Sequence, residues 1–186
     1  MDVKEAIQQR RAYRSLEPVE ITDELIHDLA GCAQLSASCN NNQPWRFVFV
    51  YELDMLKKMH ETLSKGNEWI HKASLIIAVL SKKEYDCVIG ERTYYQFDTG
   101  MATAFLILRA TERGLVAHPI AGFSPKKVRD VLGIPEDMEV ITLVNVGKHS
   151  KTINPVLSEK QRLAEKQRPE RLPLERFVYL NKYTKE

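Results

Sequence analysis

The first half of the chain alternates between segments with helical and with strand-like spacing of hydrophobic residues. Residues 2–10 predict a short amphipathic helix. A second helix is predicted over 23–36, because Thr22 can cap its amino terminus and the acidic residues that follow favour the helix dipole. A polar, turn-prone stretch leads into residues 46–51, whose aromatic and β-branched content is typical of a strand, and residues 53–64 look helical. We therefore expect the polar stretch to be a loop held between rigid elements.

The second half continues this mixture of elements. The apolar run at 73–80 predicts a strand buried on both faces. The longest helix is predicted over 93–113, and its middle is apolar almost all the way round, so that it should be buried, against either the core or a partner. Residues 115–123 predict a strand ending in a glycine turn, 124–133 a short helix from a serine cap to a glycine, and 140–146 a last core strand.

The composition changes after Gly147. Residues 158–170 are mostly charged, which favours a solvated surface, and only 177–180 return to strand-like content. Such a segment cannot bury much of its own surface, so it is either disordered or wrapped over another surface, most simply that of a second subunit. We therefore expect one domain over 1–150 and a carboxy-terminal arm over 151–186, whose residues 177–180 can add a strand to the partner's sheet.

Composition limits the classes of protein. With 186 residues, 44% of them hydrophobic, the chain can bury one sizeable core. The 27 basic and 25 acidic residues are nearly balanced, which gives no case for nucleic-acid or acidic-membrane binding. No stretch approaches the roughly 18 apolar residues of a membrane span, and the charged amino terminus does not look like a signal peptide. We expect a cytoplasmic protein.

Several kinds of site are not indicated. The three cysteines, Cys32, Cys39 and Cys87, are odd in number and lack C-x-x-C spacing, so we expect reduced thiols and no structural zinc, with Cys39 a space-filling residue rather than a redox-active one. The histidines show no metal-ligand spacing. The chain has no G-x-G-x-x-G, no phosphate-binding P-loop and no G-x-S-x-G elbow.

What remains is a group of arginines, amides and one glycine turn. Arg10, Arg11 and Arg14 suit two interpretations: a solvated basic face, or guanidinium groups that reach one phosphate and the edge of an attached ring. Their spacing alone does not choose between these interpretations.

Short segments along residues 5–178 resemble, in order, the motifs of the nitroreductase family. None is specific by itself, but their common order at plausible separations is hard to obtain by chance. These segments are Arg10-Arg11-Ala12-Tyr13-Arg14-Ser15-Leu16, Ser38 through Trp45, Asp98-Thr99-Gly100 with Ala102, Gly114-Leu115 with Pro119 through Phe123, Val144-Asn145-Val146-Gly147, and Arg171-Leu172-Pro173-Leu174.

The resemblance implies an α+β fold with a central mixed or antiparallel sheet flanked by helices, in a homodimer with exchanged carboxy-terminal arms. It implies FMN as cofactor, with Arg10 and Arg171 on its phosphate and Arg14 at the pyrimidine edge. The Asn-rich loop would come from the other subunit, and the glycine turn would bring a backbone N–H to flavin N5. The implied cofactor-binding positions are Arg10, Arg11, Ala12, Arg14, Ser38, Asn41, Gln43, Ala121, Gly122 and Arg171.

This sequence departs from the family at two places. Ala12 replaces a serine that contacts the phosphate in many relatives, and Arg11 or Arg168 can compensate for it. Some members place a lysine beside flavin N1, but Lys72 is out of register for that contact, while Trp69 packs either over the site or in the core.

Two further polar residues have structural interpretations. We expect His118 to be a strand histidine with a satisfied hydrogen bond and Asp98 to serve helix structure rather than proton transfer.

The resemblance implies an FMN-dependent oxidoreductase that moves electrons from NADH or NADPH to a nitroaromatic, quinone or similar acceptor. The flavin would carry the chemistry, so no side chain is expected to be catalytic and no metal is expected. Two alternatives remain: another flavin chemistry on the same fold, such as reductive dehalogenation or flavin fragmentation, or a non-catalytic flavin-binding protein.

Overall fold

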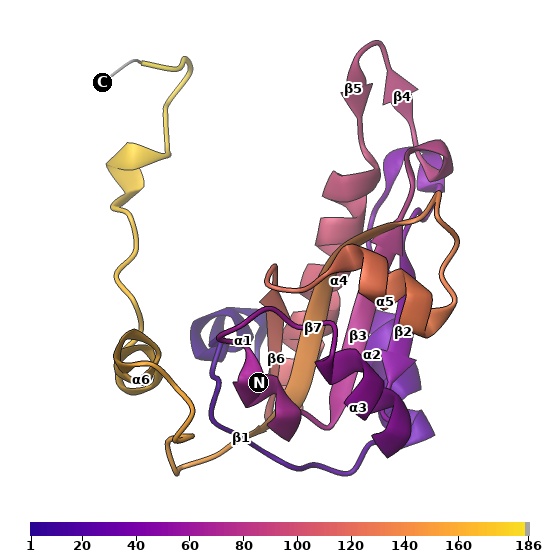
Figure 1. Ribbon diagram of the computed structural model, residues 1–186. Coiled ribbons are helices and arrows are strands. Elements are labelled where there is room, and N and C mark those ends of the chain that lie inside the picture. Colours follow the sequence, from indigo (N-terminus) through magenta and orange to yellow (C-terminus); the bar gives the residue numbers. More distant parts are fainter. Residues whose placement is uncertain (185–186) are drawn as a thin grey trace.

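The computed structural model describes residues 1–184 and combines an antiparallel sheet with surrounding helices (Figure 1). The helices are α1 (Val3–Gln9), α2 (Asp23–Gln34), α3 (Leu53–His60), α4 (Tyr95–Glu112), α5 (Pro125–Leu132) and α6 (Glu159–Lys166). The strands are β1 (Leu16–Glu17), β2 (Arg46–Val50), β3 (Leu75–Ser81), β4 (Val88–Ile89), β5 (Arg92–Thr93), β6 (Leu115–Ile120) and β7 (Glu139–His149). The α+β prediction is confirmed.

The main sheet is organised around β7, the longest strand. It pairs with β3, β6 and β1, and β2 extends the sheet from β3. Every one of these pairings is antiparallel, so the sheet is not mixed. The short β4–β5 hairpin forms a separate ribbon that projects beyond the main sheet (Figure 1).

Strand β3 is buried along its whole length, as its continuous apolar run predicted. Successive side chains of a strand point to opposite faces, so β3 supplies two cores. Leu75, Ile77 and Val79 pack in the cluster that includes residues of α2 and α4, whereas Ile76 and Ala78 pack in the cluster that includes residues of α3 and α5. The two pairs of helices therefore cover opposite faces of the sheet.

Helix α4 buries one face and exposes apolar side chains on another. Ala102, Leu106 and Ala110 have no exposed surface, whereas Phe97 and Phe105 are 65% and 45% exposed. The prediction of burial is thus correct for one face only in the single chain. Over residues 1–184, no helix is both long enough and apolar enough to cross a membrane.

The carboxy-terminal segment follows β7 and runs along one side of the molecule (yellow in Figure 1). Its charged part forms α6, begun by a capping box between Ser158 and Gln161. The strand expected over 177–180 does not form in this chain: a 3-10 turn at Leu174–Arg176 precedes these largely exposed residues. The backbone N–H groups of Phe177 and Val178 donate to the carbonyl of Leu174, and none of the described strands pairs with 177–180. The addition of a strand to a partner's sheet therefore stays a prediction.

Candidate functional site

A cationic cavity of about 350 Å³ lies between the start of the chain and the carboxy-terminal segment. Arg10, Arg11, Ala12 and Arg14 line one side and Arg171 the other, so five of the ten predicted positions meet here. The remaining lining residues come from α6 and the turn after it: Lys160, Gln161, Ala164, Arg168 and Pro169. No acidic residue lines the cavity, which makes it suited to an anion.

The arginine segment is shaped by a buried carboxylate. Helix α1 ends at Gln9, and the chain continues without regular secondary structure to β1. Glu165 of α6, only 7% exposed, accepts hydrogen bonds from the backbone N–H groups of Arg14 (2.7 Å) and Ser15 (3.0 Å). These bonds fix the backbone from which Arg14 projects.

Arg11 and Arg168 hold α6 against the same segment. The Arg11 guanidinium donates to the carbonyl of Ala164 at 2.6 Å, and Arg168 donates to the carbonyls of Gln8 and Arg10. Both arginines line the cavity while bonding to backbone carbonyls, so their first role in the structure is to join α6 to the arginine segment.

The charges in this cavity repel one another. Burial lowers the pKa of Arg10, and the charges of Arg168 and Arg171 lower that pKa further. Burial also lowers the pKa of Arg14, against the opposing effect of Glu165. A bound anion would relieve this crowding, because it offsets both the lost hydration and the mutual repulsion.

The Asn-rich loop does not line this cavity in the same chain. Asn40, Asn41 and Gln43 all have positive φ, between 50° and 58°, and Ser38 Oγ accepts the backbone N–H of Gln43 at 2.9 Å. Non-glycine residues in this region are uncommon and concentrate at functional sites. Ser38, Asn41 and Gln43 therefore lie in a strained, well-held loop that remains a predicted cofactor contact.

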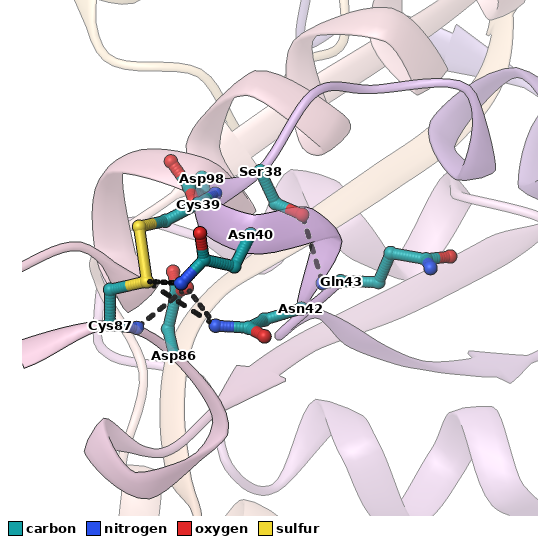
Figure 2. The surroundings of a disulfide bond; sticks show 8 residues. All are labelled: Ser38, Cys39, Asn40, Asn42, Gln43, Asp86, Cys87 and Asp98. Atoms are coloured by element: carbon teal, nitrogen blue, oxygen red, sulfur yellow. Dashed lines mark hydrogen bonds between the residues drawn. A yellow bond between two sulfur atoms is a disulfide. The ribbon is translucent and has the colours of Figure 1, made fainter.

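The prediction of reduced thiols is wrong for two of the three cysteines. Cys39 of the loop forms a disulfide with Cys87, their Cα atoms 6.0 Å apart (Figure 2). Cys32 is free. The two cysteines are 48 positions apart with no pairing signal in the sequence, and the packing of the loop against the base of the β4–β5 hairpin brings them together. Cys39 is thus a cross-link, not a space-filling residue.

Asp98, in the first turn of α4, also holds the loop. Its carboxylate accepts the backbone N–H of Cys39 at 2.7 Å and is only 2% exposed. Burial raises the pKa of Asp98, and the neighbouring Asp86 raises it as well, against the lowering effect of the bond from Cys39. Asp98 therefore has a structural role, as expected, but it serves the loop in addition to the helix.

The glycine turn is fastened to a different part of the chain. The Gly122 carbonyl accepts from the backbone N–H of Ser64 (2.9 Å) and from the Asn67 side chain (2.8 Å). A Cβ on Gly122 would lie 2.3 Å from the Asn67 amide nitrogen, so this close approach requires glycine. Ala121 and Gly122 lie outside the cationic cavity, and their contact with a flavin remains a prediction.

The structure answers the questions about Trp69 and Lys72. Trp69 is 1% exposed and packs in the core, with its ring centroid 4.7 Å from that of His118. Lys72 lines a separate depression beside His60 and His71, not the cationic cavity. The core interpretation of Trp69 is therefore correct, and Lys72 has no place in the arginine site.

His118 has the satisfied hydrogen bond that was expected, because its Nδ1 lies 3.0 Å from the Tyr13 carbonyl. It is 5% exposed, and burial lowers its pKa to about 4. The ring is therefore neutral at pH 7 and can donate its Nδ1 proton to that carbonyl.

His118 should make the fold sensitive to acid. Above pH 6.5 the ring is neutral in both states, but between pH 6.5 and about 4 only the unfolded chain binds the proton, which favours unfolding. We expect His118 to remove about 3 kcal/mol of unfolding free energy across this window. Urea unfolding of His118→Asn at pH 7 and at pH 4.5 should therefore show a shallower pH dependence than the unsubstituted protein, and equal slopes would contradict this role.

Glu165 and the α6 residues of the cavity were not predicted as site residues. The charged composition of 158–170 suggested a solvated surface, yet Ser158 followed by Gln161 is a capping-box signal that could have indicated a helix start. No sequence signal shows that Glu165 faces residues 150 positions earlier.

Known proteins resemble this chain over most of its length. The model of the nitroreductase family matches residues 7–148. A protein from Archaeoglobus fulgidus, named provisionally as an NADH dehydrogenase/NAD(P)H nitroreductase, is 34% identical over 151 residues, 76% of this chain and 82% of that protein. An iodotyrosine deiodinase from Haliscomenobacter hydrossis is 28% identical over 166 residues, 74% of this chain and 75% of that protein.

The fold is also shared with solved structures. A crystal structure of an FMN-containing oxidoreductase superposes with a TM-score of 0.85 at 24% identity, covering 100% of this chain and 95% of that one. The match to a family model over most of the chain makes this protein an oxidoreductase. The chain belongs to the nitroreductase family, whose cofactor is FMN.

Proposed function

We propose that this chain is an FMN-dependent oxidoreductase that takes electrons from NADH or NADPH and passes them to a nitroaromatic, quinone or similar small acceptor. The observation that carries the proposal is the meeting of Arg10, Arg14 and Arg171, from both ends of the chain, in one cavity without a carboxylate. Guanidinium groups bind phosphate through paired N–H donors, so this group suits the phosphate end of FMN.

The positive charges of these residues complement the negative charges of FMN. Arg10 and Arg171 would hold the phosphate, and Arg14 would stabilise negative charge at the pyrimidine edge of the ring. Bound FMN would supply the hydride chemistry. The protein would bind the cofactor, orient it and stabilise its negative charge electrostatically. Ala12 offers no hydroxyl to the phosphate, but Lys160, Arg11 and Arg168 line the same cavity.

We also propose that the site is completed in a homodimer. Ser38, Asn41, Gln43, Ala121 and Gly122 lie outside the cavity formed by their own chain, as expected if two chains each contribute part of a site. Two features support an interface along α4. Phe105 and Leu108 line an apolar groove of about 350 Å³ with residues of α1 and α2, and Phe97 is exposed nearby on the same helix. Sedimentation equilibrium should give twice the chain mass.

A relative supports the proposed electron donor. The Archaeoglobus protein carries NADH and NAD(P)H nitroreductase in its name, which supports a nicotinamide donor here. The absence of a G-x-G-x-x-G motif suits a nicotinamide that visits the site and leaves before the acceptor enters.

A second candidate function is reductive dehalogenation. The 28% identity to an iodotyrosine deiodinase over 75% of that protein favours it over the other chemistries of this fold. The two candidates differ in their oxidant, so a panel of quinones, nitroaromatics and halogenated phenols as acceptors would distinguish them.

Anaerobic stopped-flow reduction tests the proposal. NADH or NADPH should bleach the flavin absorbance of the FMN-loaded protein, and an added quinone or nitroaromatic should restore it. If neither nicotinamide bleaches the flavin, the proposed function is wrong. If purified protein is colourless and binds no added FMN, the proposed cofactor site is wrong as well.

Arg10→Ala and Arg171→Ala should each weaken FMN binding by about 10- to 100-fold, because each removes a charge-assisted bond to the phosphate. Fluorescence titration of the apoprotein with FMN measures this effect. Lys126→Ala, an exposed cation of α5 away from the cavity, is the matched control and should bind FMN normally. Unchanged affinity in both arginine variants would remove these residues from the site.

A further inference from the structure

The Cys39–Cys87 pair lies where two exposed segments meet. Cys39 belongs to the Asn-rich loop, and Cys87 follows the 3-10 turn Lys83–Tyr85 at the foot of the β4–β5 hairpin (Figure 2). A disulfide explains the position of the two sulfur atoms. It does not explain the group beside them.

That group is the carboxylate of Asp86, which is only 8% exposed. Its Oδ1 accepts the backbone N–H of Cys87 (2.8 Å) and the side-chain amide of Asn42 (3.3 Å), whereas its Oδ2 is buried without a hydrogen-bond partner. A buried carboxylate oxygen without a partner is costly, because it has lost water and gained nothing in exchange. This oxygen therefore indicates a missing positive group.

The surroundings supply no such group. Among residues 1–184, none of the ion pairs includes Asp86 or its neighbour Asp98. The donors that contact the cluster are backbone N–H groups and the amides of Asn40 and Asn42. The carboxyl of Asp98 lies close enough to Asp86 that Asp86 raises the Asp98 pKa, and it brings no positive charge to the cluster. One ligand atom from each of Cys39, Asp86 and Cys87 lies within 4.8 Å of the others, which is the arrangement of a metal-binding cluster.

We propose that Cys39, Cys87 and Asp86 form a redox-gated site for a divalent cation that prefers sulfur, of which Zn²⁺ is the representative. In the disulfide state the sulfurs are unavailable as thiolate ligands. A dithiol reductant would transfer two electrons and two protons to the disulfide, giving two thiols and its own disulfide. The cation would then displace both thiol protons and bind two thiolates and the Asp86 carboxylate, leaving a fourth position for water.

The cluster is held by bonds that do not depend on the disulfide. The amides of Asn40 and Asn42 each donate to Cys87 Sγ at 3.4 Å, and Asp98 holds the backbone N–H of Cys39. Hydrogen bonds to ligating sulfur and to the backbone beside it orient ligands before the metal arrives. The two cysteines should therefore stay close after reduction.

Cobalt(II) is the probe that tests the site. The full FMN-loaded chain is reduced with a phosphine, which is itself oxidised to the phosphine oxide, and is then titrated anaerobically with Co²⁺. We expect one Co²⁺ per chain, with a sulfur-to-cobalt charge-transfer band and tetrahedral ligand-field bands that Zn²⁺ abolishes. The charge-transfer band separates this site from the His60–His71 pair, whose ring centroids are 4.3 Å apart and which has no sulfur.

Three variants complete the experiment. Cys87→Ser should lose the charge-transfer band, and Asp86→Asn should weaken Co²⁺ binding by about tenfold or more. Cys32→Ser, which removes the free cysteine outside the cluster, should bind Co²⁺ normally. Retained flavin absorbance in each variant shows that the fold survives.

The proposal is overturned if the reduced protein binds no Co²⁺, if the oxidised protein shows the same charge-transfer band, or if Asp86→Asn binds as tightly as the unsubstituted chain. None of these results bears on nicotinamide oxidation, which is measured separately. The proposed metal site and the proposed function can therefore be refuted independently.

Discussion

Reducing the Cys39–Cys87 disulfide in metal-free buffer should lower the free energy of unfolding by about 4 kcal/mol. The bond joins residues 48 positions apart, so breaking it frees a long loop in the unfolded chain and raises the entropy of that state. Urea unfolding with and without a phosphine reductant and a chelator, at fixed concentrations of protein and FMN, measures this change.

Two variants show whether the change comes from this bond. The double substitution of Cys39→Ser with Cys87→Ser should be as unstable as the reduced protein and should no longer respond to reductant. Cys32→Ser should respond like the unsubstituted chain, because Cys32 is free. An unfolding midpoint that reductant does not move would show that the cross-link contributes nothing to stability.

The sequence predicted the elements that depend on local patterning. The expected strand at 73–80 and helix at 93–113 correspond to β3 (Leu75–Ser81) and α4 (Tyr95–Glu112) within two residues at each end. Continuous apolar runs and helix caps are local signals, so they predict an element without knowledge of the rest of the fold.

Two kinds of short strand were missed: one depends on a distant contact, and the other is a local hairpin. Strand β1 has two residues and exists because Leu16 and Glu17 pair with the end of β7. The β4–β5 hairpin is equally short, with Gly90 at its turn in the left-handed region, and it carries no apolar alternation. Nothing local in these segments distinguishes them from loop.

The residues of the site likewise divide into those that the sequence indicated and those that only the structure showed. The resemblance to the nitroreductase family named Arg10, Arg14 and Arg171, and the structure places them around one cavity. The resemblance did not show that Cys39 has a covalent partner or that Glu165 fixes the arginine segment, because both contacts join residues far apart in sequence. Family motifs indicate which groups are expected at the cofactor, whereas the groups that position them are found only from the packing.

Glu165→Ala should cost about 3 kcal/mol of unfolding free energy and should weaken FMN binding together with it. The substitution leaves the backbone N–H groups of Arg14 and Ser15 without their acceptor, and Ser15 is 1% exposed, so water does not readily replace the carboxylate. It also releases α6 from the segment that carries Arg10 and Arg14, the arginines proposed to contact FMN. Urea unfolding and FMN titration of the same variant measure the two effects.

Glu165→Gln separates the geometry of this contact from its charge. The amide keeps one oxygen that can accept one of the two backbone N–H groups, but its nitrogen cannot accept the other, so we expect a loss of about 1 to 2 kcal/mol. Glu170→Ala, an exposed carboxylate just beyond α6, is the matched control and should change neither measurement. If Glu165→Ala lowered stability while FMN affinity stayed constant, Glu165 would stabilise the fold without positioning Arg14. A parallel loss in both measurements is expected, because the two N–H groups that Glu165 holds belong to Arg14 itself and to its neighbour.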